Sequence, residues 1–154
     1  MDVPAEVIEQ SLDRVIEILI RKYDELGMRA TGEWAAELEG RTAINRGSIW
    51  GMPYTEQLVQ GRAPGKRPPI APLERWAQAK FGLSGQQARS TAFAVANKIA
   101  ESGTTWYQKG GIDLVEVLES PEVMEAFYGP ITEYLLAEVK VTIMEELRRL
   151  NVAA

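Results

Sequence analysis

The chain has 154 residues, of which 45% are hydrophobic and 25% are charged. These proportions are ordinary for a globular protein, so we expect a single domain over residues 1–154. The sequence contains no cysteine and no histidine, which excludes disulfides, thiolate chemistry and histidine-based catalysis. It has no apolar run of about 20 residues and no basic N-terminal leader, so we expect a soluble protein made in the cytoplasm and no contact with a membrane.

The net charge of −5 is distributed unevenly along the chain. Residues 61–80 carry five cations against the single acid Glu74, a local charge of +4 that leaves −9 on the remainder. The five cations are Arg62, Lys66, Arg67, Arg75 and Lys80. Such a segment suits docking to an acidic surface, including a second copy of the same chain. The alternative is a solvated loop that happens to be basic.

The N-terminal region has the periodicity of a helix. Apolar residues recur there at steps of three and four, which places them on one face. They are Val7, Ile8, Leu12, Val15, Ile16, Leu19, Tyr23 and Leu26. We expect a helix over about residues 3–26, capped by Asp2 and ended by Gly27, with a length of roughly 36 Å. A helix this long predicts a second helix as its partner.

The period changes to two over residues 34–45, where the even positions are mostly apolar and the odd positions mostly polar. This alternation predicts a half-buried strand. We expect "NRGS" (45–48) to form a turn and "SIWG" (48–51) to form the return strand. Because a hairpin alone is marginal in water, it must pack on the helices or extend a neighbouring molecule's sheet. A short helix is expected over "YTEQLVQG" (54–61).

Helical patterns dominate the rest of the sequence. We expect helices over residues 72–82 and 84–103, the second opened by a capping box of Ser84 and Gln87. Residues 104–111 read as a loop, and residues 112–128 as two short helices or as a strand and a helix, with a helix start at Ser120. A final helix is expected to begin at Pro130. Its apolar stripe consists of Ile131, Leu135, Val139, Ile143, Leu147 and Leu150.

The predicted fold class is therefore α+β. We expect long N-terminal and C-terminal helices to pack against each other and against a small antiparallel β-hairpin, with shorter helices in the centre of the chain. No internal repeat, low-complexity tract or linker interrupts this pattern.

The segment "GRAPGKRPPIAP" (61–72) differs most from the rest of the chain. Its "GRAPGK" run is a poor match to a phosphate-binding loop, which needs four residues between its first glycine and the Gly-Lys pair, followed by Ser or Thr. Here three residues intervene and Arg67 follows the lysine. Such a loop also works through backbone N–H groups, which Pro64, Pro68 and Pro69 lack. We therefore expect no nucleotide cofactor.

Nucleic acid is the next candidate ligand of this basic region. Cations near Trp76 could contact phosphates while the indole stacks on a base. However, Trp76 falls on the same apolar stripe as Leu73, and a dedicated nucleic-acid binder is usually basic overall. A nucleic-acid-binding accessory protein that uses residues 61–80 remains the alternative function.

Catalytic residues are not apparent. The serines at positions 48, 84, 90 and 102 have no histidine to activate them. Two carboxylates could pair as in a glycosidase, and the candidates are Glu37, Glu39, Glu145 and Glu146. However, each of them lies on a helix or strand face where charged side chains exposed to solvent are ordinary. We expect no enzyme activity, no metal and no cofactor.

The interpretation that remains for residues 61–72 is a rigid extended segment. Its prolines hold it near polyproline geometry, so it loses little entropy when it binds a partner.

Several runs of the sequence resemble the tail-completion, or neck, proteins of tailed bacteriophages. These runs are "ATGEW" (30–34), "GMPYTEQLVQGRAPGKRPPIAPLERWAQAKFGL" (51–83) and "AFAVANKIAESGT" (92–104). The matching positions are Thr31, Gly32, Pro53, Tyr54, Gly61, Arg62, Pro64, Gly65, Lys66, Pro68, Pro69, Trp76, Lys80, Gly82, Leu83, Ile99, Ala100, Gly103 and Thr104.

The resemblance covers about residues 30–105, and departs from the family pattern at Gln60, at Val95-Ala96 and in a longer C-terminal part. It implies a virion structural protein of the head–tail connector, assembled in the host cytoplasm. Such a protein forms a homo-oligomeric ring between the portal-bound adaptor and the tail tube or its terminator, through which DNA passes without specific binding. We expect the contact between subunits or with neck partners to include Arg62, Pro64, Gly65, Lys66, Arg67, Pro68 and Pro69.

Overall fold

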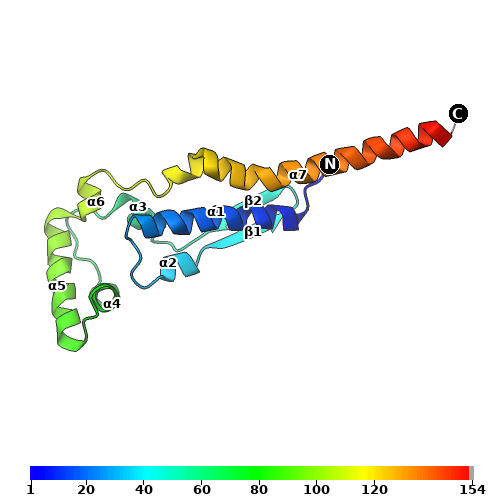
Figure 1. Cartoon of the computed structure of the whole chain (residues 1–154). Helices are drawn as coiled ribbons and strands as arrows, with labels where there is room; N and C mark the ends of the chain where they lie inside the picture. The colour runs from blue at the N-terminus through cyan, green and yellow to red at the C-terminus, as the bar shows by residue number, and fades with distance from the viewer. Residues whose placement is uncertain (153–154) are drawn as a thin grey trace. The chain divides into compact units, whose positions relative to one another are not determined.

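The structure, a computed structural model, describes residues 1–152. It is largely helical, with one two-stranded antiparallel sheet and long helices at both ends of the chain (Figure 1). The elements are α1 (Ala5–Glu25), α2 (Glu33–Ala36), β1 (Glu39–Ala43), β2 (Arg46–Trp50), α3 (Thr55–Gln60), α4 (Ile70–Phe81), α5 (Gly85–Ser102), α6 (Thr105–Gln108), the 3₁₀ turn η1 (Glu116–Glu119) and α7 (Pro121–Val152). The predicted α+β fold class is confirmed.

The chain divides into two compact units that interleave in sequence. The first unit contains residues 1–19, residues 38–50 and the chain from Val117 onward. The second contains residues 20–37 and 51–116. The single domain expected over the whole chain stays a prediction.

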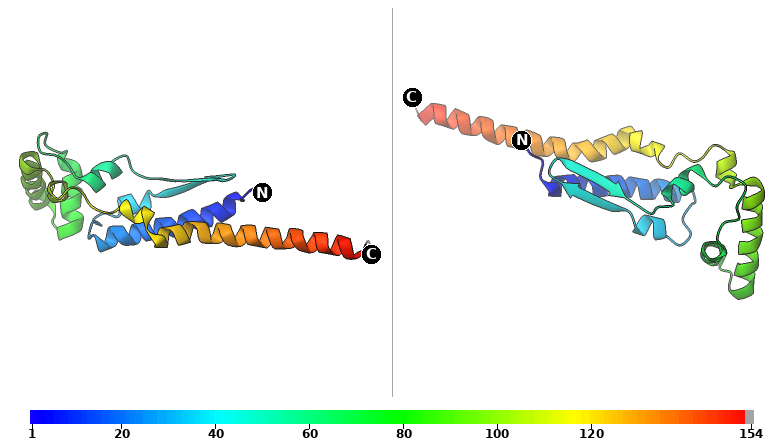
Figure 2. Two further views of the ribbon diagram at one scale, coloured as in Figure 1. Left: turned by 90° about the horizontal axis from the view of Figure 1, so that it is seen from above. Right: turned by 180° about the vertical axis from the view of Figure 1, so that it is seen from behind.

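In the first unit, α1 and the N-terminal part of α7 lie side by side (Figure 2). Val15, Ile18 and Leu19 of α1 and Val123 of α7 form a buried cluster. The partly buried residues around this cluster are Leu38, Ile49, Val117, Leu118, Ala126 and Phe127. The expected pairing of the terminal helices with each other and with the hairpin is therefore present over this stretch.

The β-hairpin packs on α1 through its glycines. Strands β1 and β2 pair from Glu39 with Trp50 to Ala43 with Arg46. A Cβ at Gly47 would lie 2.8 Å from a side-chain carbon of Ile8, and one at Gly40 would lie 3.2 Å from the Cβ of Leu12. The absence of side chains at these two positions lets the strands approach the helix closely. Of the two alternatives left open for the hairpin, the structure thus shows packing on a helix.

The predicted limits of the first strand are wrong at both ends. Residues 33–36 form helix α2, which follows Gly32 in a left-handed conformation with φ of 80°. At the other end, the turn lies at residues 44–45 and Asn45 takes a φ of 58°. The return strand therefore starts at Arg46, and Gly47 belongs to the strand and not to the turn. The alternation itself is correct for β1, whose residues are alternately exposed and half-buried.

The predicted helix starts also need correction. Ser84 precedes α5, but its side chain makes no capping hydrogen bond, so the capping box does not form. Asp2 is not the capping residue of α1 either, because the helix begins at Ala5 and Pro4 stands before its first residue. Asp2 Oδ1 accepts a hydrogen bond from Asn45 Nδ2 at 2.7 Å. Residues 104–111, expected to be a loop, contain the short helix α6. Residues 112–128 contain η1 and the start of α7, and no strand lies within them.

Helix α7 begins at Pro121, so the helix start expected at Ser120 is confirmed, whereas the separate helix start expected at Pro130 is wrong. Ser120 Oγ accepts a hydrogen bond from Val123 N at 3.3 Å, which satisfies a free N–H group of the first turn. Pro130 lies inside the helix with its ring buried, and the helix continues through it. Beyond Leu135 every residue whose burial is described is exposed, so the expected pairing with α1 does not extend to the Ile143 region.

We predict that Leu12→Ala and Ile143→Ala differ strongly in their effect on stability. Leu12 packs against the hairpin and is only 4% exposed. Its truncation should lower the free energy of unfolding by about 2–5 kcal/mol. Ile143 is 53% exposed, and its truncation in dilute protein should change that free energy by only about 0.5 kcal/mol. Urea denaturation followed by circular dichroism measures both values. Equal losses in the two variants would contradict this packing.

Candidate interaction site

The segment around Arg62 is tied to the C-terminal end of α5 by backbone hydrogen bonds. Gly65 N donates to Ala100 O at 2.8 Å, and Thr104 N donates to Arg62 O at 2.9 Å. Arg62 N in turn donates to Thr104 Oγ1 at 3.0 Å. Three hydrogen bonds thus hold residues 61–65 against residues 100–104, which lie about forty positions further along the chain. We refer to this arrangement as the Thr104 junction.

Two glycines make the Thr104 junction possible. Gly61 has a φ of 82°, and a Cβ there would lie 2.5 Å from Thr104 Oγ1 and 2.6 Å from Tyr107 N. Gly103 has a φ of 75°, and a Cβ there would lie 2.7 Å from Arg62 O. Distances below 3.0 Å to backbone atoms leave no room for a side chain. Both positions therefore require glycine for conformation and for space.

Thr104 holds the junction together, although its place in the sequence motif suggested no role for it. Its side chain is buried, with 7% of the residue exposed. Besides accepting from Arg62 N, Oγ1 accepts a weaker hydrogen bond from Tyr107 N at 3.4 Å and so caps α6. A threonine directly before a helix is typical of an N-cap residue. Nothing in the sequence indicated that its second partner would be Arg62.

The junction leaves the charged side chains of the segment at the surface. Lys66 and Arg67 are exposed, while Arg62 is half-buried and reaches Lys66 O with Nη2 at 3.5 Å. No ion pair within residues 1–152 involves any of these three side chains. Unpaired cations at fixed positions can meet carboxylates of a partner.

The prolines of the segment differ in their surroundings. Pro68 is buried, whereas Pro64, Gly65 and Pro69 are exposed. The Cδ of Pro64 lies 3.2 Å from the position that a Cβ on Gly103 would occupy, so this ring packs against the junction. The predicted site residues thus belong to one anchored stretch, and their role as a contact surface stays a prediction.

A cavity of about 860 Å³ lies in the second unit beside this segment. Its walls combine aromatic rings and prolines with the cations of the basic segment. The main lining residues are Trp34, Trp76, Trp106, Arg62, Lys66 and Arg67. Trp76, expected to be part of the core, is only half-buried and faces this cavity, with its ring against Phe81 at a centroid distance of 5.2 Å. The cavity has the size of a binding site.

Polar groups in the wall of the cavity are fixed or unpartnered. Trp34 Nε1 donates to Thr55 Oγ1 at 3.0 Å, and its ring lies 4.7 Å from the ring of Tyr23. Trp106 Nε1 is buried and finds no hydrogen-bond partner among the described residues. Burial raises the pKa of both the Tyr23 and the Tyr54 hydroxyl above its ordinary value. The wall therefore offers hydrogen-bond donors as well as apolar surface.

Other kinds of site are not apparent over residues 1–152. This part of the chain contains no group of three acidic side chains placed to hold a metal ion. None of its helices has the length and apolar character needed to span a membrane. Comparison with family models, with curated proteins and with solved structures found no match to the chain.

We predict that Gly61→Ala destabilises the protein far more than Gly82→Ala. Gly82 also has a positive φ, 66°, but a Cβ there meets nothing within 4 Å, so the cost is about 1–2 kcal/mol of backbone strain. At Gly61 the strain adds to the overlap with Thr104 and Tyr107, giving about 2–6 kcal/mol in total. Thermal unfolding of the two variants measures the difference, and similar melting temperatures would contradict the Thr104 junction.

Proposed function

We propose that this chain is a structural protein of a tailed-bacteriophage virion, a neck or tail-completion component. It assembles into a homo-oligomeric ring that joins the portal-bound adaptor to the tail. The observation that carries the proposal is the Thr104 junction. Two of the sequence runs on which the resemblance to neck proteins rests, residues 51–83 and 92–104, are bonded to each other there.

The geometry of the junction explains why those runs would occur together in one family. Gly61 and Gly103 supply the close approach, Thr104 supplies the buried hydroxyl, and Pro64 packs against Gly103. Each of these residue types is needed because of another residue in the set. A protein that shares the runs is therefore expected to share the anchored basic segment, which supports the resemblance on physical grounds.

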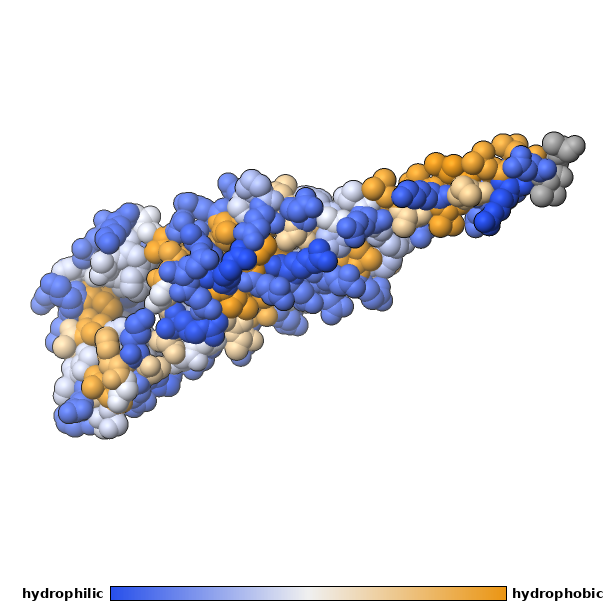
Figure 3. All heavy atoms as spheres, in the orientation of Figure 1, coloured by the Kyte–Doolittle hydropathy of each residue, from blue (hydrophilic) through white to orange (hydrophobic). Residues whose placement is uncertain are grey.

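Self-assembly is supported by the exposed apolar surface of α7. In Figure 3 the part of this helix beyond the rest of its unit shows a concentration of hydrophobic residues. Leu136, Ile143 and Leu150 each expose half or more of their surface. Exposed apolar surface of this extent marks interaction sites in soluble proteins. A ring of identical subunits would cover it in every copy.

The distribution of charge supports the same role. The chain outside residues 61–80 carries a net charge of −9. A ring with acidic walls would repel the phosphates of DNA that passes through it, so that the genome slides without binding. The basic segment would then meet the acidic surface of a neighbouring subunit or of another neck protein.

The double variant Lys66→Glu/Arg67→Glu tests this function. Both side chains are exposed and without ion pairs in the described chain, so the melting temperature should stay within about 2 °C of the original. A single ion pair at the surface contributes only about 0.2–1 kcal/mol to the stability of a contact. In a ring, however, the two reversed charges occur in every subunit, so their unfavourable effects on assembly sum over many contacts. We expect heads and tails to fail to join in particles assembled with this variant, as counted by electron microscopy.

A variant with the same change of charge elsewhere is the matched control. Lys98 and Lys109 are exposed residues outside the basic segment, and Lys98→Glu/Lys109→Glu should leave joining intact. Normal particles with the Lys66/Arg67 variant would contradict the proposal and indicate a solvated loop. Normal particles combined with loss of a salt-dependent DNA affinity would instead favour the nucleic-acid-binding function.

A further inference from the structure

Each strand of the β-hairpin has one edge that pairs with no other strand of the described chain. The turn at residues 44–45 has two residues, so Ala43 and Arg46, which close it, exchange backbone hydrogen bonds. Hydrogen-bonded and non-hydrogen-bonded pairs alternate along an antiparallel ladder, and Gly40 and Thr42 lie at positions of the second kind. The backbone N–H and C=O groups of Gly40 and Thr42 therefore point away from β2.

The outward groups of β1 have no hydrogen-bond partner within residues 1–152. The hydrogen bonds between the hairpin and other elements involve Asn45 in the turn, which contacts Val3 N and Asp2 Oδ1. None of them involves the backbone of Gly40 or Thr42. Groups of this kind recur at every second residue, at a repeat of about 6.8 Å along the strand. Because another strand has the same repeat, an extended chain is the partner that matches this edge.

Apart from its length of only five residues, β1 lacks the features that usually keep a strand edge unpaired. Its sequence EGRTA contains neither proline nor lysine, and its pairing with β2 is regular, without a bulge. Strand β2 lies on the side of the hairpin nearer α7 (Figure 1), and its Ile49 packs against the cluster that contains Val123 of α7. No residue of β1 belongs to that cluster. The edge of β1 is therefore the more accessible of the two.

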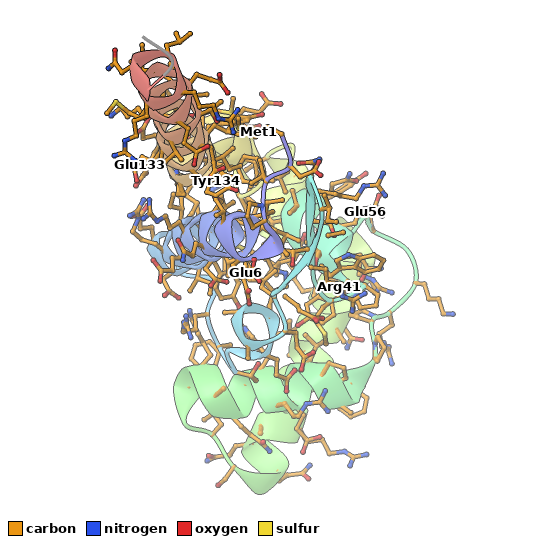
Figure 4. The ribbon with its side chains drawn as sticks, turned by 90° about the vertical axis from the view of Figure 1, so that its right-hand side faces the viewer. Met1, Glu6, Arg41, Glu56, Glu133 and Tyr134 are labelled. Carbon is orange, nitrogen blue, oxygen red and sulfur yellow. The ribbon has the colours of Figure 1, made fainter. Side chains whose placement is uncertain are left out.

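The charged side chains of β1 are placed on either side of Gly40. Glu39 and Arg41 carry opposite charges and are both exposed, and Figure 4 shows Arg41 on the side of the hairpin away from α1. Within one chain, Arg41 donates from Nε and Nη2 to the same atom, Glu39 Oε2, at 3.2 Å and 3.0 Å. Glu39 Oε1 and Arg41 Nη1 have no hydrogen-bond partner within residues 1–152. Each side chain thus keeps one group for a second partner.

We propose that the β1 edges of two copies pair antiparallel about a two-fold axis at Gly40 and form a four-stranded sheet. In this register the Gly40 residues of the two copies exchange both backbone hydrogen bonds. Glu39 of each copy then stands directly opposite Arg41 of the other, at a non-hydrogen-bonded position where side chains approach most closely. The free carboxylate oxygen and the free guanidinium N–H pair there across the axis.

Charge selects this register over its neighbours. A shift that sets Gly40 opposite Thr42 of the second copy would place Arg41 opposite Arg41, and like charges in this position are destabilising. A further shift, with Thr42 at the axis, would place Arg41 opposite Ala43 and leave Glu39 beyond the end of the paired strand. Only the register centred on Gly40 gives both charges of each copy an opposite charge.

This inference goes beyond the proposed function and does not depend on it. A two-fold contact closes after two copies, whereas a ring needs head-to-tail contacts between two different surfaces. The β1 pair is therefore measured on the isolated protein, separately from head–tail joining. Normal joining with the Lys66/Arg67 variant would contradict the neck function and leave the β1 pair standing, and failure of the experiments below would do the reverse.

Disulfide crosslinking tests the register, because the chain has no cysteine of its own. The two variants are Glu39→Cys and Arg41→Cys, and their equimolar mixture keeps one intact pair of Arg41 with Glu39. Directly opposite residues have Cβ atoms about 4.5–5.5 Å apart, and a disulfide needs Cα atoms closer than about 7 Å. Under mild oxidation the mixture should give a dimer joined between positions 39 and 41, identified by peptide mass spectrometry.

Each variant alone should crosslink at least tenfold less, because its two cysteines would lie about 8 Å apart. Lys98→Cys, at an exposed position of α5, mixed with Arg41→Cys measures the background from random collisions. Crosslinking of Arg41→Cys with itself would indicate the shifted register, and crosslinking with Ser48→Cys would indicate head-to-tail pairing of β1 with β2. Either result without the 39–41 crosslink, or no crosslink above background, would overturn the inference.

Charge reversal tests the same contact without crosslinking. Arg41→Glu makes both charges of β1 acidic and Glu39→Arg makes both basic, so each variant alone should associate about tenfold or more weakly in sedimentation equilibrium. Their mixture should associate at least as strongly as the original protein. The double variant Glu39→Arg/Arg41→Glu exchanges the two charges and should also associate like the original.

Two controls separate this contact from effects inside one chain. Arg46→Glu makes the same change of charge at an exposed position of β2 and should leave association unchanged. Circular dichroism should show the same helix content in all variants. Arg41 also stacks on Trp50, with Cζ 4.4 Å from the ring centre. If the double variant is as weak as Arg41→Glu, loss of this stacking explains the result and the proposed pairing is wrong.

Discussion

The close approach of residues 61–65 to residues 100–104 is the constraint on which the candidate site depends. A buried hydroxyl must be hydrogen-bonded, and Thr104 meets this requirement by accepting from the backbone of Arg62. That geometry leaves no space for side chains at Gly61 and Gly103. Because hydrogen bonds hold the backbone near both ends of residues 61–65, the backbone at the adjacent Lys66 is also held in place.

The second constraint is that one helix carries two apolar faces. A helix that packs on one side of its unit can bury only the face turned toward it, and α7 buries the face of Val123. Apolar residues on its other side, among them Leu136, Ile143 and Leu150, remain at the surface, which is costly for a monomer and useful for an assembly. The buried Pro130 lies between the two regions and belongs to the first face.

Charge and apolar surface act together in the proposed assembly. The proposed ring brings the cations of residues 61–80 against acidic surface, and it covers the exposed aliphatic side chains of α7. Electrostatic complementarity of this kind selects partners and orientations more than it adds affinity, and burial of the apolar surface supplies most of the affinity. A ring of identical subunits requires head-to-tail contacts between two different surfaces of each copy.

Local sequence patterns determined the fold class, the buried face of α1 and the alternation of exposed and half-buried residues along β1. Each of these follows from apolar spacing within one element, which a single sequence displays directly. The ends of elements were less predictable: the turn formed at residues 44–45 and not at 45–48, and the helix that starts after Ser120 continued through Pro130, where a separate helix had been expected to begin. Only the tertiary structure decided the rest. The partner of Thr104 is about forty residues away, and the face of α7 that becomes buried depends on where α1 lies, so neither could be determined from local spacing.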